Sequence, residues 1–96
     1  MRKLILAELA PDRASQVLGR ARSIGDSRVV CGVHYLSDIE AGRTTGAALV
    51  ATLHGDAAFR ADMERARAEL AALRAGAHGA PADCAVQDEA ATHAPY

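Results

Sequence analysis

The stretch from residue 57 to residue 75, AAFRADMERARAELAALRA, predicts a long amphipathic α-helix. Its apolar side chains recur every three or four residues, which matches the 3.6-residue turn of an α-helix. Opposite charges four residues apart, Arg60 with Glu64 and Arg65 with Glu69, are expected to pair and to contribute about 0.2–0.5 kcal/mol each. This pattern indicates an all-α fold. The apolar face consists of Phe59, Met63, Ala66, Leu70 and Leu73.

The residues before this helix predict another helix and the turn that joins the two. The sequence SDIE at residues 37–40 has the pattern of a capping box that opens a helix. Gly55 is expected to close that helix, and Asp56 to cap the next one. Gly42 and Gly46 lie on a face of small residues, where a second helix can approach closely.

Two further helices are expected at the start of the chain. Residues 2–10 are apolar at helical spacing, and Pro11 is expected to end that helix. A second helix is predicted over residues 11–24, with proline at its favourable first position. Gly25 and Asp26 then break the pattern. The β-branched residues that follow, Val29, Val30 and Val33, predict a turn or a poorly helical segment.

Residues 76–96 mix Gly, Ala, Pro, His and Asp without a period, which predicts a disordered tail after one domain over residues 1–75. Cys84 in this tail could pair with Cys31 in an oxidising compartment, or both could stay unpaired thiols. His78 and His93 are too scattered for a zinc site, and no cofactor is expected. His54 is expected to be structural, because an imidazolium suits the C-terminal end of a helix.

Four residues between the predicted helix over residues 11–24 and the helix that follows the SDIE segment have side chains suited to phosphoryl chemistry. Ser27, Arg28, His34 and Asp38 have the spacing S-R-x5-H-x3-D. An arginine offers a planar fork of donors to phosphate oxygens, and a histidine ring nitrogen can attack phosphorus. An aspartate four residues later can hold the imidazole if the segment is helical. Each also has a simpler interpretation: a surface arginine, a structural histidine, a helix-start charge and a serine that caps a turn.

The segment around this pattern resembles the third signature motif of the class A bacterial non-specific acid phosphatases. These enzymes belong to the superfamily of type 2 phosphatidic acid phosphatases and vanadium haloperoxidases. The resemblance covers roughly residues 4–73. The flanking positions that carry it are Cys31-Gly32, Ser37-Asp38, Ala41-Gly42-Arg43, residues 47–54, and Ala58-Phe59 with the Ala/Arg/Glu-rich helix that follows.

The resemblance implies a fragment of a helical bundle that hydrolyses phosphomonoesters through a phosphohistidine. His34 would be the nucleophile, Asp38 would orient it, and Arg28 and Ser27 would bind the phosphate. The family's other motifs, K-x6-R-P and P-S-G-H, do not occur in this sequence. We therefore expect the C-terminal part of an acid phosphatase, with weak or no activity in isolation because the general acid and several donors are missing.

Composition and charge argue against some classes of protein and leave others open. The net charge is −1 and aromatic residues make up 3% of the 96 residues, so nucleic-acid binding is not expected. No run approaches the roughly 20 apolar residues of a membrane span. The resemblance implies a periplasmic location, although the apolar start is too short for a signal peptide and Glu8 interrupts it. A lipid phosphatase or a haloperoxidase is one alternative. The other is a non-catalytic helical module that forms a homo-oligomer through Gly42 and Gly46.

Overall fold

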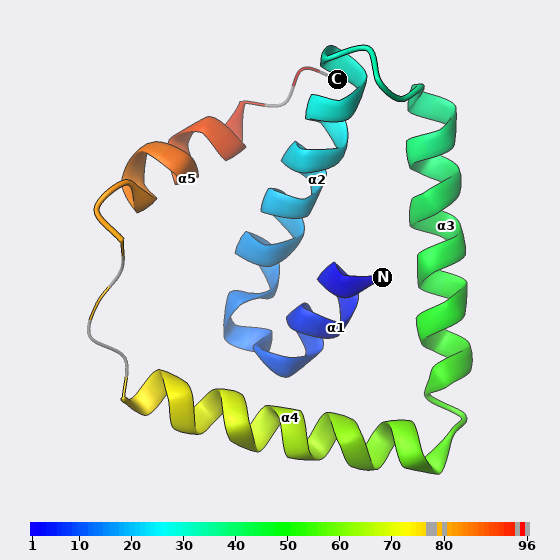
Figure 1. Cartoon of the computed structure of the whole chain (residues 1–96), viewed down its shortest axis with the longest axis vertical. Coiled ribbons are helices and arrows are strands. Elements are labelled where there is room, and N and C mark those ends of the chain that lie inside the picture. The colour runs from blue at the N-terminus through cyan, green and yellow to red at the C-terminus, as the bar shows by residue number, and fades with distance from the viewer. Residues whose placement is uncertain (77–78, 80, 94, 96) are drawn as a thin grey trace.

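The computed structural model describes residues 1–76, 79, 81–93 and 95. All regular structure in these residues is helical, which confirms the all-α prediction. Figure 1 shows α1 and α2 as a hairpin at the centre, with α3, α4 and α5 around it, in a flat molecule of 39 × 36 × 18 Å. The elements are α1 (Arg2–Leu9), the 3₁₀ helix η1 (Pro11–Arg13), α2 (Ala14–Val30), α3 (Leu36–Leu53), α4 (Ala57–Ala75) and α5 (Cys84–Thr92).

The first helix ends where the sequence predicts, but the second is longer. Pro11 follows the end of α1 and opens the short 3₁₀ helix, because its ring fixes φ and it has no N–H to continue α1. α2 then continues through Gly25 and Asp26 as far as Val30. The predicted break at Gly25-Asp26 is therefore wrong. Tertiary contacts override local propensity here, since Asp26 is buried against α3 and Gly25 allows that approach.

The start of α3 differs from the predicted capping box by two residues. The helix begins at Leu36, Tyr35 is its N-cap residue, and Ser37 lies inside the first turn. The Asp38 carboxylate, at the third helical position, accepts a hydrogen bond from the Tyr35 N–H at 2.8 Å. The capping interaction therefore joins Tyr35 to Asp38, whereas the predicted box joined Ser37 to Glu40.

The predicted helix over residues 57–75 is confirmed in full as α4. Asp56 caps it, because its carboxylate accepts hydrogen bonds from the N–H groups of Ala58 (2.7 Å) and Phe59 (3.1 Å). The predicted ion pairs of this helix are wrong. Arginines pair three residues back instead, and Arg60 donates to the carbonyl of His54 at 2.6 Å. The pairs that form are Arg65 with Asp62 and Arg67 with Glu64.

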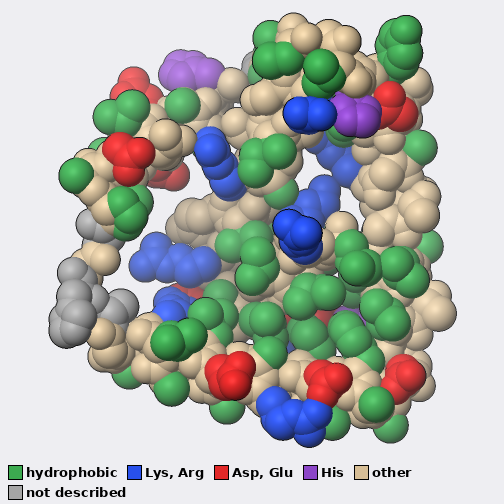
Figure 2. Space-filling view, viewed as in Figure 1, with side chains coloured by type: hydrophobic (Ala, Val, Ile, Leu, Met, Phe, Trp, Pro, Cys, Tyr) green, Lys and Arg blue, Asp and Glu red, His purple; other side chains and the backbone are tan. Residues whose placement is uncertain are grey.

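The helices enclose very little core. Among the described residues only Val50 and Met63 are buried apolar side chains. Gly46 of the predicted small-residue face is buried against the N-terminus of the same chain, whereas Gly42 has open space around it. Figure 2 shows apolar side chains gathered around α1, with openings on both sides of α2. None of the described helices combines the length and the apolar character needed to cross a bilayer.

Part of the predicted disordered tail forms a helix. α5 lies against α2 and begins at Cys84, which faces a shallow cleft shared with Arg13 and Arg20. Residues 84–92 include three alanines, a glutamine and a glutamate, which favour helix once α2 offers a surface. Cys31 and Cys84 are both exposed, unpaired thiols in this structure. His78 lies outside the described residues.

Candidate active site

The candidate site is built on the turn that joins α2 to α3. α2 ends in a Schellman motif, in which Gly32 adopts a left-handed conformation with φ of 74°. The Gly32 N–H donates to the carbonyl of Val29 at 3.0 Å, and the Val33 N–H donates to that of Arg28 at 3.1 Å. The His34 N–H also donates to the Arg28 carbonyl, at 3.2 Å. The turn therefore ties the backbone of His34 directly to that of Arg28.

His34 and Asp38 face each other across the first turn of α3. The Nδ1 atom of His34 lies 3.0 Å from Oδ1 of Asp38, while Oδ2 of Asp38 accepts from the Tyr35 N–H. Asp38 therefore both contacts the imidazole and caps the helix. A carboxylate at this position favours the tautomer with the proton on Nδ1, which leaves the lone pair on Nε2. The two side chains are 45% and 47% exposed, so Nε2 is open to a ligand from solvent.

Arg28 and Ser27 lie in the last turns of α2, before the turn that leads to His34. The Arg28 side chain is exposed and makes no hydrogen bond or ion pair with the described part of the chain, so its guanidinium is available to an anion. The Ser27 hydroxyl donates to the carbonyl of Ser23 at 2.8 Å, and must rotate to reach a phosphate. Figure 2 shows basic, histidine and acidic side chains on the surface at this α2–α3 corner.

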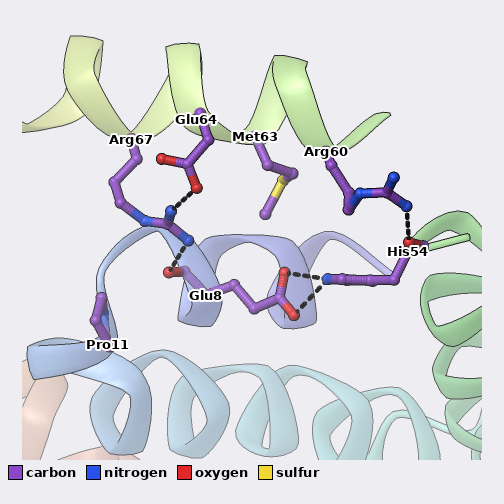
Figure 3. Close-up of a pocket in the computed structure, with 7 residues that line it drawn as sticks. All are labelled: Glu8, Pro11, His54, Arg60, Met63, Glu64 and Arg67. Carbon is purple, nitrogen blue, oxygen red and sulfur yellow. Dashed lines mark hydrogen bonds and ion pairs between the residues drawn. The ribbon is translucent and has the colours of Figure 1, made fainter. Parts of the chain in front are cut away.

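A second cluster of titratable groups lies at the other end of α3, about 27 Å along that helix. Nε2 of His54 is 2.9 Å and 3.0 Å from the two carboxylate oxygens of Glu8, and its Nδ1 is 2.7 Å from the Val50 carbonyl oxygen (Figure 3). Both ring nitrogens face acceptors, an arrangement that favours the protonated ring. The Val50 carbonyl, with help from Glu8, raises the pKa of His54.

The pocket around His54 has a volume of about 730 Å³, and internal contacts already occupy its polar groups. Arg60 donates to the His54 carbonyl, and Arg67 donates to the Glu8 carbonyl at 3.4 Å (Figure 3). The ring of Phe59 meets that of His54 edge-on at 5.3 Å. This cluster joins α1, α3 and α4, as expected for a structural histidine. Sequence analysis missed its Glu8 partner because 46 residues separate the two.

The described residues contain no group of three or more side chains placed to hold a metal ion. The side chains of the site offer a chemistry of their own. It combines one guanidinium, one imidazole with a lone pair on Nε2, and one carboxylate that orients the ring. Such a set can bind a tetrahedral anion and attack its central atom.

Comparison with known proteins relates the chain to acid phosphatases. An acid phosphatase of Zymomonas mobilis subsp. mobilis is 53% identical over 75 residues, which are 78% of this chain and 28% of that protein. Non-specific acid phosphatases of Providencia stuartii and Salmonella typhimurium are 38% and 42% identical, over 74% and 70% of this chain.

These alignments cover 29% and 27% of the Providencia and Salmonella proteins, so the chain spans less than a third of the length of these relatives. No family model matches the chain, and no solved structure gives a significant match. The relationship to acid phosphatases therefore rests on sequence identity to one part of those proteins.

Proposed function

We propose that residues 1–75 form one side of an acid phosphatase active site that hydrolyses phosphomonoesters in the periplasm. The observation that supports this most directly is the contact between His34 and Asp38, on a turn bonded to the backbone of Arg28, whose side chain makes no hydrogen bond or ion pair within the described residues. It occurs in a chain that is related to acid phosphatases over most of its length. Exposed histidine–carboxylate pairs are common, but here the pair stands on a turn that also ties it to Arg28.

In the proposed reaction, Nε2 of His34 attacks phosphorus, and a P–N bond forms as the P–O bond to the alcohol breaks. The Asp38 carboxylate keeps the proton on Nδ1 and compensates the positive charge that the ring gains. Arg28 donates to the equatorial oxygens, where negative charge accumulates, and Ser27 adds one hydroxyl after rotation. Water then attacks the phosphohistidine, which releases inorganic phosphate and restores the lone pair on Nε2.

The leaving alkoxide takes its proton from a general acid. We assign this acid to a histidine outside the sequence, because neither P-S-G-H nor K-x6-R-P occurs within it. Loss of a single oxyanion donor typically lowers kcat by about 10²–10³. The chain by itself is therefore expected to bind a phosphate-like anion but to turn over substrate weakly or not at all.

Binding of vanadate, which mimics the phosphoryl group, tests the proposal. Titration of the full chain, followed by ⁵¹V NMR, is expected to give an affinity that falls about tenfold or more in Arg28→Ala and His34→Ala. Arg65→Ala is the matched control, since Arg65 is an exposed arginine on α4 whose one ion-pair partner among the described residues is Asp62. Its affinity should stay within about twofold of the wild type.

Two outcomes would contradict this account. Vanadate binding that His34→Ala leaves unchanged would remove His34 from the site. Rapid hydrolysis of p-nitrophenyl phosphate by the purified chain, abolished by His34→Ala, would show that the general acid lies within the sequence after all.

A non-catalytic helical module is the second candidate, because large apolar side chains remain on the surface. Tyr35 is 80% exposed and Leu73 is 72% exposed. Under this alternative the chain is expected to form a homo-oligomer through such surfaces and to ignore vanadate. Size-exclusion chromatography with light scattering, run with and without vanadate, separates the two candidates.

A further inference from the structure

Asp26 is the one buried charged side chain in the described part of the chain, at 4% exposure. Two arginines approach its carboxylate. Nε of Arg22, on the same helix, lies 3.7 Å from Oδ2, and Nη2 of Arg43, on α3, lies 3.5 Å from Oδ1. Removing a carboxylate from water is costly unless cations compensate it. Asp26 therefore holds Arg43 against α2.

Gly25 makes room for this contact. A Cβ atom at Gly25 would lie 3.0 Å from Nη2 of Arg43 and 3.3 Å from Cγ2 of Ile39. The two helices thus meet at Gly25, and a methyl group there would crowd the Arg43 guanidinium that faces Asp26, which would have to shift by a few tenths of an ångström. Nη1 of Arg43 pairs with Glu40 on α3, whereas Nη2 is buried and has no hydrogen-bond partner in the described structure, so the attraction to Asp26 acts on Nη2.

This ion pair joins the two helices that carry the candidate site. Arg28 lies on α2, whereas Asp38 lies on α3 and His34 lies in the turn between them. Figure 1 shows the two helices diverging from that turn. The contact of Asp26 with Arg43 is an ion pair that joins α2 to α3. The turn already bonds the backbone of His34 to that of Arg28, so this contact bears on the angle between the helices and on where the Arg28 side chain lies relative to Asp38.

We infer that Asp26 and Arg43, seated against Gly25, are positioning residues that set Arg28, His34 and Asp38 for one phosphoryl group. They touch neither the nucleophile nor the ligand. The inference rests on the proposed function for the identity of that ligand. A misplacement of about 1 Å in a site of this kind can lower its efficiency about a hundredfold.

Two glycine-to-alanine variants of α2 separate positioning from folding. Gly25→Ala displaces Arg43, whereas Gly19→Ala places its methyl group where no atom lies within 4 Å. Both gain the better helix propensity of alanine, so both should keep or raise the helix content measured by circular dichroism. We expect vanadate affinity to fall about tenfold in Gly25→Ala and to stay within about twofold of the wild type in Gly19→Ala.

Asp26→Asn and Asp26→Glu test the charge itself. Asp26→Asn removes the attraction for Arg43, so the nuclear Overhauser contact between Gly25 and the Ile39 methyl group should disappear and vanadate affinity should fall. Asp26→Glu keeps the carboxylate and should restore affinity to within about threefold of the wild type. Asp62→Asn, at an exposed acid of α4, is the control for loss of one negative charge.

Equal vanadate affinity in Gly25→Ala and Gly19→Ala would overturn the inference. This comparison tests the inference even if Asp26→Asn fails to fold. An Asp26→Asn variant that keeps both the Gly25–Ile39 contact and its affinity would overturn it as well. A wild-type chain without vanadate binding overturns the proposed function instead. In that case, the nuclear Overhauser contact between Gly25 and Ile39, measured in Asp26→Asn, still shows whether the ion pair holds α2 against α3.

Discussion

Replacing Gly32 by alanine is expected to lower the free energy of unfolding by about 1 kcal/mol. Gly32 has φ of 74°, and an added Cβ atom would meet nothing within 4 Å, so the effect comes from the backbone alone. The left-handed conformation costs an alanine about 1–2 kcal/mol, and a stiffer unfolded chain offsets roughly 0.4–1 kcal/mol of that. Asparagine tolerates this conformation better, so Gly32→Asn should lose less.

Gly42→Ala is the matched control, because Gly42 lies inside α3 and also has open space around it. Alanine in a helix interior gains about 0.8–1 kcal/mol over glycine. The two variants should therefore differ by about 2 kcal/mol and lie on opposite sides of the wild type. Urea unfolding followed by far-ultraviolet circular dichroism measures both. A Gly32→Ala variant as stable as Gly42→Ala would refute the assignment of a left-handed glycine at the site.

Three other predictions concern stability and pH. The hydrogen bond from Arg74 lowers the pKa of Asp12 from 3.8 to about 2. The ionised Asp12 carboxylate therefore stabilises the folded chain fully above pH 3.8, and this stabilisation is lost as the pH falls through about 2. Asp12→Asn should therefore be less stable than the wild type at neutral pH and equal to it below pH 2 in acid titrations. The backbone carbonyl of Val50 is the main cause that raises the pKa of His54 above 6.5. The protonated His54 ring therefore stabilises the folded chain fully below pH 6.5, and this stabilisation is lost as the pH rises through the raised pKa. Glu8→Gln should lower that pKa in an NMR titration, and an unchanged midpoint would contradict the contact. Met63→Ala should cost about 2 kcal/mol in urea unfolding, the low end for buried methionine, because Val50 is the only other buried apolar side chain among the described residues; no loss would contradict its burial.

Local patterns in the sequence were enough to predict much of the fold. α4 follows from its apolar spacing, its start follows from Asp56, and the end of α1 follows from Pro11. Each of these signals acts within about one helical turn, so no knowledge of the rest of the chain is needed. The pairing of His34 with Asp38 was predictable in the same way, from a spacing of four residues.

Long-range contacts decided the features that sequence analysis missed. α2 continues past Gly25 because Arg43, 17 positions after Asp26, compensates the buried carboxylate. His54 meets Glu8 from 46 residues away, so no spacing rule could have found the pair. Gly32 is different, because a glycine after a run of helical residues is a signal for a C-terminal cap. That signal was present in the sequence and marks the turn on which the site stands.

His34 of this chain is, in the proposed function, the nucleophile of an acid phosphatase site. The most direct measurement replaces the matching segment of the Zymomonas acid phosphatase, 53% identical over 75 residues, with the aligned residues of this chain. The chimera is expected to hydrolyse p-nitrophenyl phosphate, and the same chimera with His34→Ala should lose at least about a thousandfold in kcat. A folded chimera that is inactive, or one that stays active without His34, would contradict the claim.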